Sequence, residues 1–476
     1  MRQQTSVKPA GGWVGDVIPW QEDGVFHLFY LHEVRSTPKP GTGWHVLRTT
    51  DLVRFEEGGV ALAAGADDAP DFNAYTGSVV KDAHGVHHLF YTGQNPRRLG
   101  DDGLPLQIVM HATSHDAMAS WQRHPEHAFG ATAGYESADW RDPFVFWDDD
   151  RRVWRMLVAA RHSSGPERRR GVIAQCVSTD LERWEAAEPF WDPRRYIAHE
   201  CPEVFTWGEW WYLVYSEFSD AFATRYRMSR SVDGPWIAPP RDTLDGRAFY
   251  AAKSAERDGR RLFFGWIATR EGARDDGPWE WAGTLAVLEA RQEPDGTLAF
   301  QLTGELLASF EGDERTPAFP AALDAGGRHE VVMDDRELTG AFHASVRFEV
   351  GEDSREFGLL VRASADGDHG YAIRLEPERG RMVFDRWPRA RTGDAQWQVS
   401  GDVPYVIELE RPCDLSPGHH VLDVVVDGDV CIANLDRSVT LSNRIYDHVA
   451  GRVGVFATEG SVGIASARIR TRSSQD

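Results

Sequence analysis

Cysteine is scarce in this chain of 476 residues, and none of its four cysteines stands in a CxxC pair. No cysteine or histidine cluster has the spacing of a zinc site, so we expect no metal site and no cofactor. Unpaired cysteines are usually buried, and we expect the same here. The four residues are Cys176, Cys201, Cys413 and Cys431.

Long apolar runs and positive charge are also lacking. No segment approaches the roughly 20 apolar residues of a membrane-spanning helix, and Met1 to Ala10 lacks the apolar core of a signal peptide. We therefore expect a cytoplasmic protein. Lys and Arg number 52 against 74 Asp and Glu, a net charge of −22. This charge argues against nucleic acid or an anionic membrane as partner, and it says nothing of oligomeric state.

Aromatic residues are plentiful, with 18 Trp, and many fall in a repeated pattern. A short turn followed by an aromatic-rich strand recurs along the first 300 residues. The spacing is irregular, about 40–50 residues or more, which is typical of propeller blades. β-branched and aromatic enrichment bounded by Gly and Asp favours strands over helices. The segments are 24–30, 85–91, 152–159, 208–215 and 259–266.

Another strand precedes each of these segments, at 15–20, 75–80, 140–147, 200–207 and 250–256. The first strand of a propeller blade lines the central channel. Asp16, Asp142 and Glu200 lie at equivalent places in units one, three and four. Because radial symmetry directs such places at one axis, we expect these three acids to meet in space.

The repeated pattern fades after Phe300. We predict a five-bladed propeller over residues 1–305, a linker with a helical turn over 306–320, and a β-sandwich over 321–476. Short alternating strands with turn signals between them indicate the sandwich. They are expected at 342–350, 356–362, 370–375, 420–426, 430–435 and 451–457. The predicted fold class is all-β.

Several motifs resemble those of glycoside hydrolase family 32, the β-fructofuranosidases (invertases, inulinases and levanases), and the resemblance covers nearly the whole chain. It implies a five-bladed propeller with an attached β-sandwich. Arg141-Asp142-Pro143 and Glu200-Cys201-Pro202 are specific because they occur together and in this order. The other similar segments are 75–78, 249–252, 265–266, 426–428 and 442–446.

The resemblance implies a role for each acid in a retaining double displacement. Asp16 matches the nucleophile, Asp142 the residue that binds sugar hydroxyls and stabilises the transition state, and Glu200 the general acid/base. Such a mechanism places nucleophile and acid about 5 Å apart. The substrate would be sucrose or a fructo-oligosaccharide with a terminal β-fructofuranosyl residue. Candidate substrate-binding residues are Trp44, Tyr75, Ser78, Arg141, Tyr250 and Trp281.

Three carboxyls in one site cannot all ionise cheaply, because like charges raise the pKa of the most easily protonated one. We expect Glu200 to hold that proton, as a general acid must. We expect Arg141 to help keep its neighbour Asp142 ionised. An acid at the start of a buried strand can also be a turn carboxylate without chemistry, but three such acids at equivalent places favour catalysis.

The first motif departs from the resembled family, which usually has Asn-Asp-Pro-Asn-Gly where this chain has Gly15-Asp16-Val17-Ile18-Pro19. Leu31 and His199 also stand where family members tend to carry Gln and Trp. Another glycone, such as arabino- or galactofuranoside, or fructosyl transfer therefore stays open. Two further alternatives are an inverting furanosidase resembling family 43, with carboxyls about 6.5–9.5 Å apart, and a sugar-binding propeller without catalysis.

Overall fold

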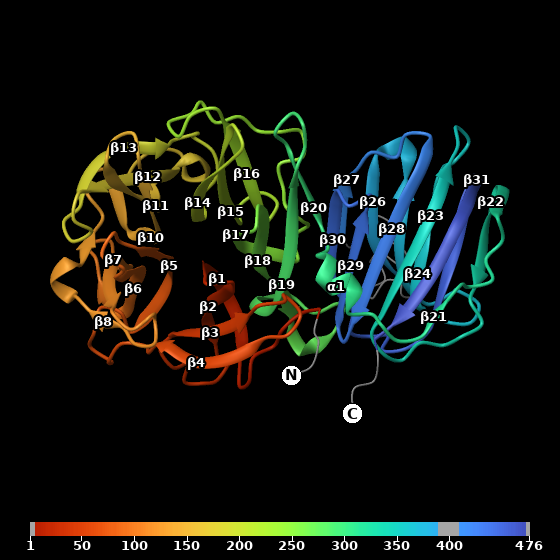
Figure 1. The fold of residues 1–476 in the computed structure, drawn as a ribbon, viewed down its shortest axis with the longest axis horizontal. Helices are drawn as coiled ribbons and strands as arrows, with labels where there is room; N and C mark the ends of the chain where they lie inside the picture. Colours follow the sequence, from red (N-terminus) through yellow and green to blue (C-terminus); the bar gives the residue numbers. More distant parts are fainter. Residues whose placement is uncertain (1–4, 389–408, 473–476) are drawn as a thin grey trace.

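The computed structural model describes residues 5–388 and 409–472. The first four residues of the segment Met1 to Ala10 lie outside this range. The fold is almost entirely β, as the sequence predicts, and Figure 1 shows a propeller of strands around a common centre beside a β-sandwich. Within residues 5–388 and 409–472, no helix is both long and apolar enough to span a membrane.

The propeller consists of five antiparallel units in chain order. Adjacent strands pair within each unit, except that β9 pairs with β7, and the predicted aromatic-rich segments form the second strand of each unit. The units are β1 (Trp13–Glu22), β2 (Val25–Glu33), β3 (Trp44–Thr49) and β4 (Glu56–Leu62); β5 (Asn73–Lys81), β6 (His87–Leu99), β7 (Pro105–Ser114), β8 (Gln122–Arg123) and β9 (Phe129–Gly130); β10 (Tyr135–Asp148), β11 (Val153–His162), β12 (Gly171–Ser178) and β13 (Glu185–Trp191); β14 (Glu200–Trp207), β15 (Trp210–Glu217) and β16 (Ala223–Ser229); β17 (Phe249–Arg257), β18 (Arg260–Arg270), β19 (Trp279–Gln292) and β20 (Leu298–Gln301).

The last unit closes onto the first through backbone pairing. Val14 of β1 pairs with Gly283 of β19, and Val7 exchanges hydrogen bonds of 2.9 and 3.0 Å with Leu285. One sheet therefore contains strands from both ends of the propeller sequence. This closure fixes β1, which carries Asp16, against the fifth unit.

A short helix leads from the propeller to the sandwich. α1 (Gly304–Ala308) begins after Thr303, whose side chain accepts a hydrogen bond from the backbone N–H of Leu306 and caps the helix. It lies at the start of the segment expected to be a linker. The remaining helical turns are η1 (Pro125–His127), η2 (Glu167–Arg169), η3 (Glu271–Ala273) and η4 (Pro377–Arg379).

The sandwich is organised around one long strand. β31 runs for 20 residues, pairing with β22 and β24 in its first half and with β23 and β21 in its second. Every strand predicted for this domain is present. The strands are β21 (Glu314–Arg315), β22 (Ala322–Met333), β23 (Phe342–Val350), β24 (Glu356–Ala363), β25 (Gly370–Glu376), β26 (Arg381–Trp387), β27 (Leu409–Pro412), β28 (Gly418–Asp427), β29 (Val430–Leu435), β30 (Val439–Arg444) and β31 (Arg452–Thr471).

The two domains share a continuous apolar core that runs from Phe205 in the propeller to Ile469 in the sandwich. Buried polar groups reinforce it. Arg444 of β30 is fully buried and donates to the backbone oxygens of Ile267 and Ala268 at 2.7 and 2.9 Å. The sandwich therefore supports β18, the neighbour of the strand that closes the propeller.

Candidate active site

The first strand of every propeller unit is interrupted by a bulge at the same place. Register shifts fall between the residue pairs Val14/Val17, Tyr75/Gly77, Arg141/Phe144, Glu200/Glu203 and Tyr250/Lys253. A bulge leaves residues unpaired and re-aims their side chains. Each of the five bulges therefore directs side chains of its own unit toward the centre of the propeller.

The register also corrects the expected equivalence of the three acids. Asp16 lies two residues before Ile18, which pairs with Phe29, and Asp142 lies two residues before Phe144, which pairs with Leu157. The two aspartates therefore occupy matching places. In the fourth unit this place belongs to Cys201, so Glu200 lies one residue earlier and matches Arg141. The acids converge because the bulges bring two successive positions to the centre, not because all three share one position.

Backbone strain marks the bulges of three units. Asp142, Cys201 and Ala251 have φ values of 57°, 50° and 51°, in the left-handed region that residues with a side chain rarely adopt. Such strain costs about 1–3 kcal/mol per residue and concentrates at functional sites. Asp142 is held there by its own N–H, which donates to Thr92 Oγ1 at 2.8 Å.

Asp16 is surrounded by hydrogen-bond donors. Thr76 Oγ1 and Trp266 Nε1 donate to its carboxylate at 2.5 and 3.1 Å, and Cys201 Sγ lies 3.6 Å from Oδ2. Burial raises the pKa of Asp16, and the hydrogen bonds from Thr76 and Trp266 oppose that rise. An indole N–H can only donate, so it pairs best with the ionised carboxylate.

Asp142 lies beside Asp16 and is nearly closed to solvent, with 4% of its surface exposed. Its Oδ2 accepts a hydrogen bond of 2.9 Å from the backbone N–H of Cys201. Cys201 therefore contacts both aspartates and directly follows Glu200 in the chain. Burial raises the pKa of Asp142, the charge of Arg141 lowers it, and the charge of Asp16 raises it again.

Glu200 is more open than Asp142, with 23% of its side chain exposed. Arg141 Nη2 donates to Oε1 at 3.1 Å, and the Tyr250 hydroxyl lies 2.7 Å from Oε2. Burial raises the pKa of Glu200, and Arg141 lowers it. A hydroxyl can donate or accept, so Tyr250 accommodates both protonation states of Glu200.

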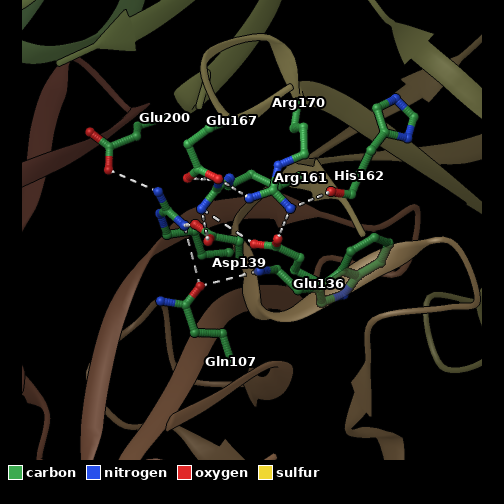
Figure 2. A network of polar contacts seen from close by, with 10 residues as sticks. Gln107, Glu136, Asp139, Arg161, His162, Glu167, Arg170 and Glu200 are labelled. Atoms are coloured by element: carbon green, nitrogen blue, oxygen red, sulfur yellow. Dashed lines mark hydrogen bonds and ion pairs between the residues drawn. The ribbon is translucent and has the colours of Figure 1, made fainter. Parts of the chain in front are cut away.

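Arg141 contacts Glu200 more closely than Asp142, whose Oδ2 lies 4.0 Å from Nε. The sequence predicted that Arg141 favours the ionised form of Asp142, and its charge does lower the pKa of Asp142, but its direct hydrogen bond goes to Glu200. A network of polar contacts continues behind Arg141 (Figure 2). Asp139 accepts a hydrogen bond from Arg141. Asp139 also accepts from Arg161 at 3.2 Å. The further members are Gln107, Glu136, Glu167 and Arg170.

The predicted substrate-binding residues divide into two groups. Arg141 and Tyr250 contact Glu200, and Trp281 lies beside Trp266. Tyr75 directly precedes Thr76, which donates to Asp16. Trp281 is 40% exposed and packs edge-to-face with Trp266, the residue that binds Asp16, at a ring separation of 6.1 Å. An exposed indole beside the residue that binds Asp16 offers a surface for a sugar.

Trp44 and Ser78 lie beneath the site. Trp44 is fully buried in a core cluster and donates through Nε1 to the Tyr75 backbone oxygen at 3.1 Å, so it has no face open to a sugar. Ser78 Oγ donates to Pro143 O at 2.9 Å and accepts from Val145 N–H at 3.0 Å. These two residues position the first strands, which is a correction to their expected contact with substrate.

Sequence reasoning missed Trp266, Thr76 and Asp139 as parts of the site. Trp266 pairs with Tyr250 across β17 and β18, and Asp139 stands two residues before Arg141. Chain proximity to a motif was the only available signal for Asp139. Among residues 5–388 and 409–472, no group of three or more His, Cys, Asp or Glu is arranged to hold a metal ion.

Comparison with protein families places this site in a known context. The sequence model described as the glycosyl hydrolases family 32 N-terminal domain matches residues 7–292, and the family 32 C-terminal model matches residues 322–471. The chain belongs to glycosyl hydrolase family 32. It is therefore a glycoside hydrolase by family. The first matched region contains β1 to β19 of the propeller, and the second contains β22 to β31 of the sandwich.

Relatives within family 32 extend over most of the chain. The raffinose invertase of Escherichia coli is 27% identical over 479 residues, covering 95% of this chain and 91% of that protein. The sucrose-6-phosphate hydrolase of Escherichia coli is 26% identical over 309 residues, covering 61% of this chain and 62% of that protein.

Solved structures share the fold over nearly the full length. The fructan 1-exohydrolase IIa of Cichorium intybus has a TM-score of 0.77 at 16% identity, covering 99% of this chain and 97% of that one. The exo-inulinase of Aspergillus awamori has a TM-score of 0.75 at 18% identity, covering 98% and 97%. At these identities the likeness shows the fold of this family 32 chain.

Proposed function

We propose that this family 32 protein hydrolyses terminal β-fructofuranosyl residues with retention of configuration. The observation that carries the proposal is the different hydrogen bonding of two carboxyls in one site. Asp16 faces Trp266 Nε1, which can only donate, whereas Glu200 faces the Tyr250 hydroxyl, which can also accept. Asp16 thereby has a donor that favours its ionised form, while Glu200 has Tyr250 for its protonated form and Arg141 for its ionised form.

These states match the two halves of a double displacement. Glu200 gives its proton to the glycosidic oxygen while that oxygen leaves, and Asp16 forms a bond to the anomeric carbon. Glu200, now ionised beside Arg141, takes a proton from water. That water attacks the anomeric carbon, releases the free sugar and restores Asp16. Asp142 accepts hydrogen bonds from sugar hydroxyls throughout.

Three observations support a fructofuranosyl substrate. The relatives are named for raffinose and sucrose-6-phosphate, and the solved structures of like fold for fructan and inulin. Arg141 provides donors beside Glu200, and Trp281 provides apolar surface beside Trp266. The site residues come from units one, two, three and five as well as four, so a small sugar can contact all of them at once.

The experiment measures reducing sugar released from sucrose, inulin, levan and aryl furanosides by the native protein and by Glu200→Gln. Glutamine keeps the size of the side chain but cannot donate the proton, so we expect a loss of about 100- to 10,000-fold. Glu209→Gln, on an exposed turn, serves as the control. NMR of the first product anomer should show retention.

Other outcomes separate the alternatives. Inversion of the anomer would contradict the roles of Asp16 and Glu200. Cleavage of aryl arabino- or galactofuranosides without cleavage of any fructan would keep the roles and change the glycone. Transfer products from sucrose would indicate a fructosyltransferase. Sugar binding with no turnover on any substrate would point to a binding propeller.

A further inference from the structure

Five equivalent positions, one per propeller unit, each stand one residue before the matching residues Asp16, Thr76, Asp142, Cys201 and Ala251. Four of them carry large side chains: Tyr75, Arg141, Glu200 and Tyr250. The fifth is Gly15, which precedes Asp16 in β1. The first unit therefore contributes no side chain at the place where the others surround the catalytic acids.

The backbone does not require glycine at this position, because Gly15 is not among the residues with positive φ. Space requires it. A Cβ on residue 15 would lie 2.5 Å from Cη2 and 3.0 Å from Cζ2 of Trp281, and 3.1 Å from Cβ of Leu31. Cβ atoms do not approach other carbons to 2.5 Å, so any side chain at position 15 displaces the indole of Trp281.

Trp281 is fixed in this place from several sides. Its backbone oxygen accepts a hydrogen bond of 3.0 Å from Arg35 Nη2, and its ring contacts Trp266 edge-to-face. The Lys39 ammonium lies 5.8 Å from its ring centroid. Despite these contacts the side chain stays 40% exposed. The indole is thus ordered, open to solvent and next to the residue that holds Asp16.

We propose that the indole of Trp281, seated on Gly15, is the specificity-determining wall of the sugar site on the side of the nucleophile. An indole face packs against carbon-bound hydrogens and offers no partner for hydroxyl groups there. Leu31 is buried and lies behind this wall, beside Gly15. The site therefore selects a furanosyl group that turns a C–H surface toward β1, and it discriminates weakly against glycones that lack a hydroxyl on that side.

This inference rests on the proposed function, and a double-mutant cycle tests it separately. The proteins are native, Gly15→Asn, Trp281→Ala and Gly15→Asn/Trp281→Ala. The readouts are KM and kcat on sucrose and on an aryl arabinofuranoside, and inhibition by free fructose. Gly340→Asn is the matched control, because a Cβ at Gly340 meets no atom within 4 Å.

Trp281→Ala should raise the inhibition constant of fructose about tenfold and leave kcat within about threefold, since stacking contributes binding more than chemistry. Its effect should differ at least fivefold between the two substrates. Trp281→Phe should restore most of the binding. Gly15→Asn alone should lower kcat/KM about a hundredfold, and removal of the indole in the double variant should recover at least tenfold of that loss.

Additive effects of the two substitutions would overturn the inference, as would an unchanged substrate ratio in Trp281→Ala. Thermal melting of all four proteins identifies a variant that fails to fold; in that case Trp281→Phe and the substrate ratio decide. Turnover of no furanoside by the native protein would instead overturn the proposed function. The cycle would then be measured on fructose binding by calorimetry, where additivity again contradicts the inference.

Discussion

The indole N–H of Trp266 donates a hydrogen bond of 3.1 Å to Oδ1 of Asp16, across 250 positions of sequence. Both side chains come from strands of the same closed sheet, β18 and β1. The hydrogen bond favours the charged form of Asp16, the proposed nucleophile, against the burial that raises its pKa.

Trp266→Phe should therefore raise the pKa of Asp16 further. Asp16 must be ionised to attack, so the acidic limb of the kcat/KM profile should move to higher pH. A hydrogen bond to a charged group contributes about 1.5–3 kcal/mol, which corresponds to a shift of about one to two pH units. Trp184→Phe is the control, because among the described residues Trp184 Nε1 has no hydrogen-bond partner. An acidic limb that stays in place would contradict this role.

Asp139→Asn should change the basic limb of the pH profile of kcat/KM. Asp139 holds Arg141, and its loss removes a negative charge behind Glu200 and leaves Arg141 freer to pair with it. Both effects lower the pKa of Glu200, which must be protonated in the first step. The basic limb of the kcat/KM profile should move to lower pH, by about one unit. A uniform fall in kcat at every pH would indicate lost structure instead, and Glu209→Gln provides the baseline.

A cluster of histidines in the second unit should make the protein sensitive to acid. His111 lies 3.0 Å from His88 and 2.9 Å from His127, nitrogen to nitrogen. Burial, followed by the neighbouring histidines, lowers the pKa of His111 to about 2. In the unfolded chain this pKa is about 6.5, so the unfolded state binds the proton first as the pH falls.

The contribution of His111 to the free energy of unfolding is therefore fully present above about pH 6.5. It decreases by about 1.4 kcal/mol for each pH unit below that value. His111→Gln should reduce the loss of unfolding free energy between pH 6.5 and pH 5 by about 2 kcal/mol. Urea denaturation at the two pH values measures this. His84→Gln, at an exposed turn, should keep the native pH dependence; an equal change in both variants would contradict the prediction.

Arg444→Met should weaken the attachment of the sandwich to the propeller. Besides the two backbone oxygens of β18, Arg444 donates to Thr284 Oγ1 at 2.7 Å and pairs with Asp429. Methionine leaves these buried acceptors unpaired, and we expect a loss of about 3–5 kcal/mol in unfolding free energy. Denaturation in urea measures it, and exposed Arg437→Met should change stability little. Equal midpoints for both variants would refute the role of Arg444.

Strands whose pattern is visible locally could be placed from the sequence. The segment predicted at 342–350 is β23 with the same bounds, because its alternation of apolar and polar residues is regular. β22 was missed because it is a largely exposed strand that pairs only with β31. β26 was missed because its charged residues break the pattern, and Asp385 is compensated by Arg374 at 3.3 Å. Such compensation comes from another strand and leaves no local signal.

The sequence alone determined the class of fold, the five-fold repeat and the three acids at the starts of their strands, because turns, alternation and short motifs are local properties. Tertiary structure decided how these residues meet. The bulge register places Glu200 one position earlier in its strand than Asp142 in its own, and Arg141 donates a hydrogen bond to Glu200. Packing buries Trp44 and places the indole of Trp281 against Gly15. These outcomes depend on contacts between strands far apart in the chain, where space and hydrogen-bond partners are set by the closure of the propeller.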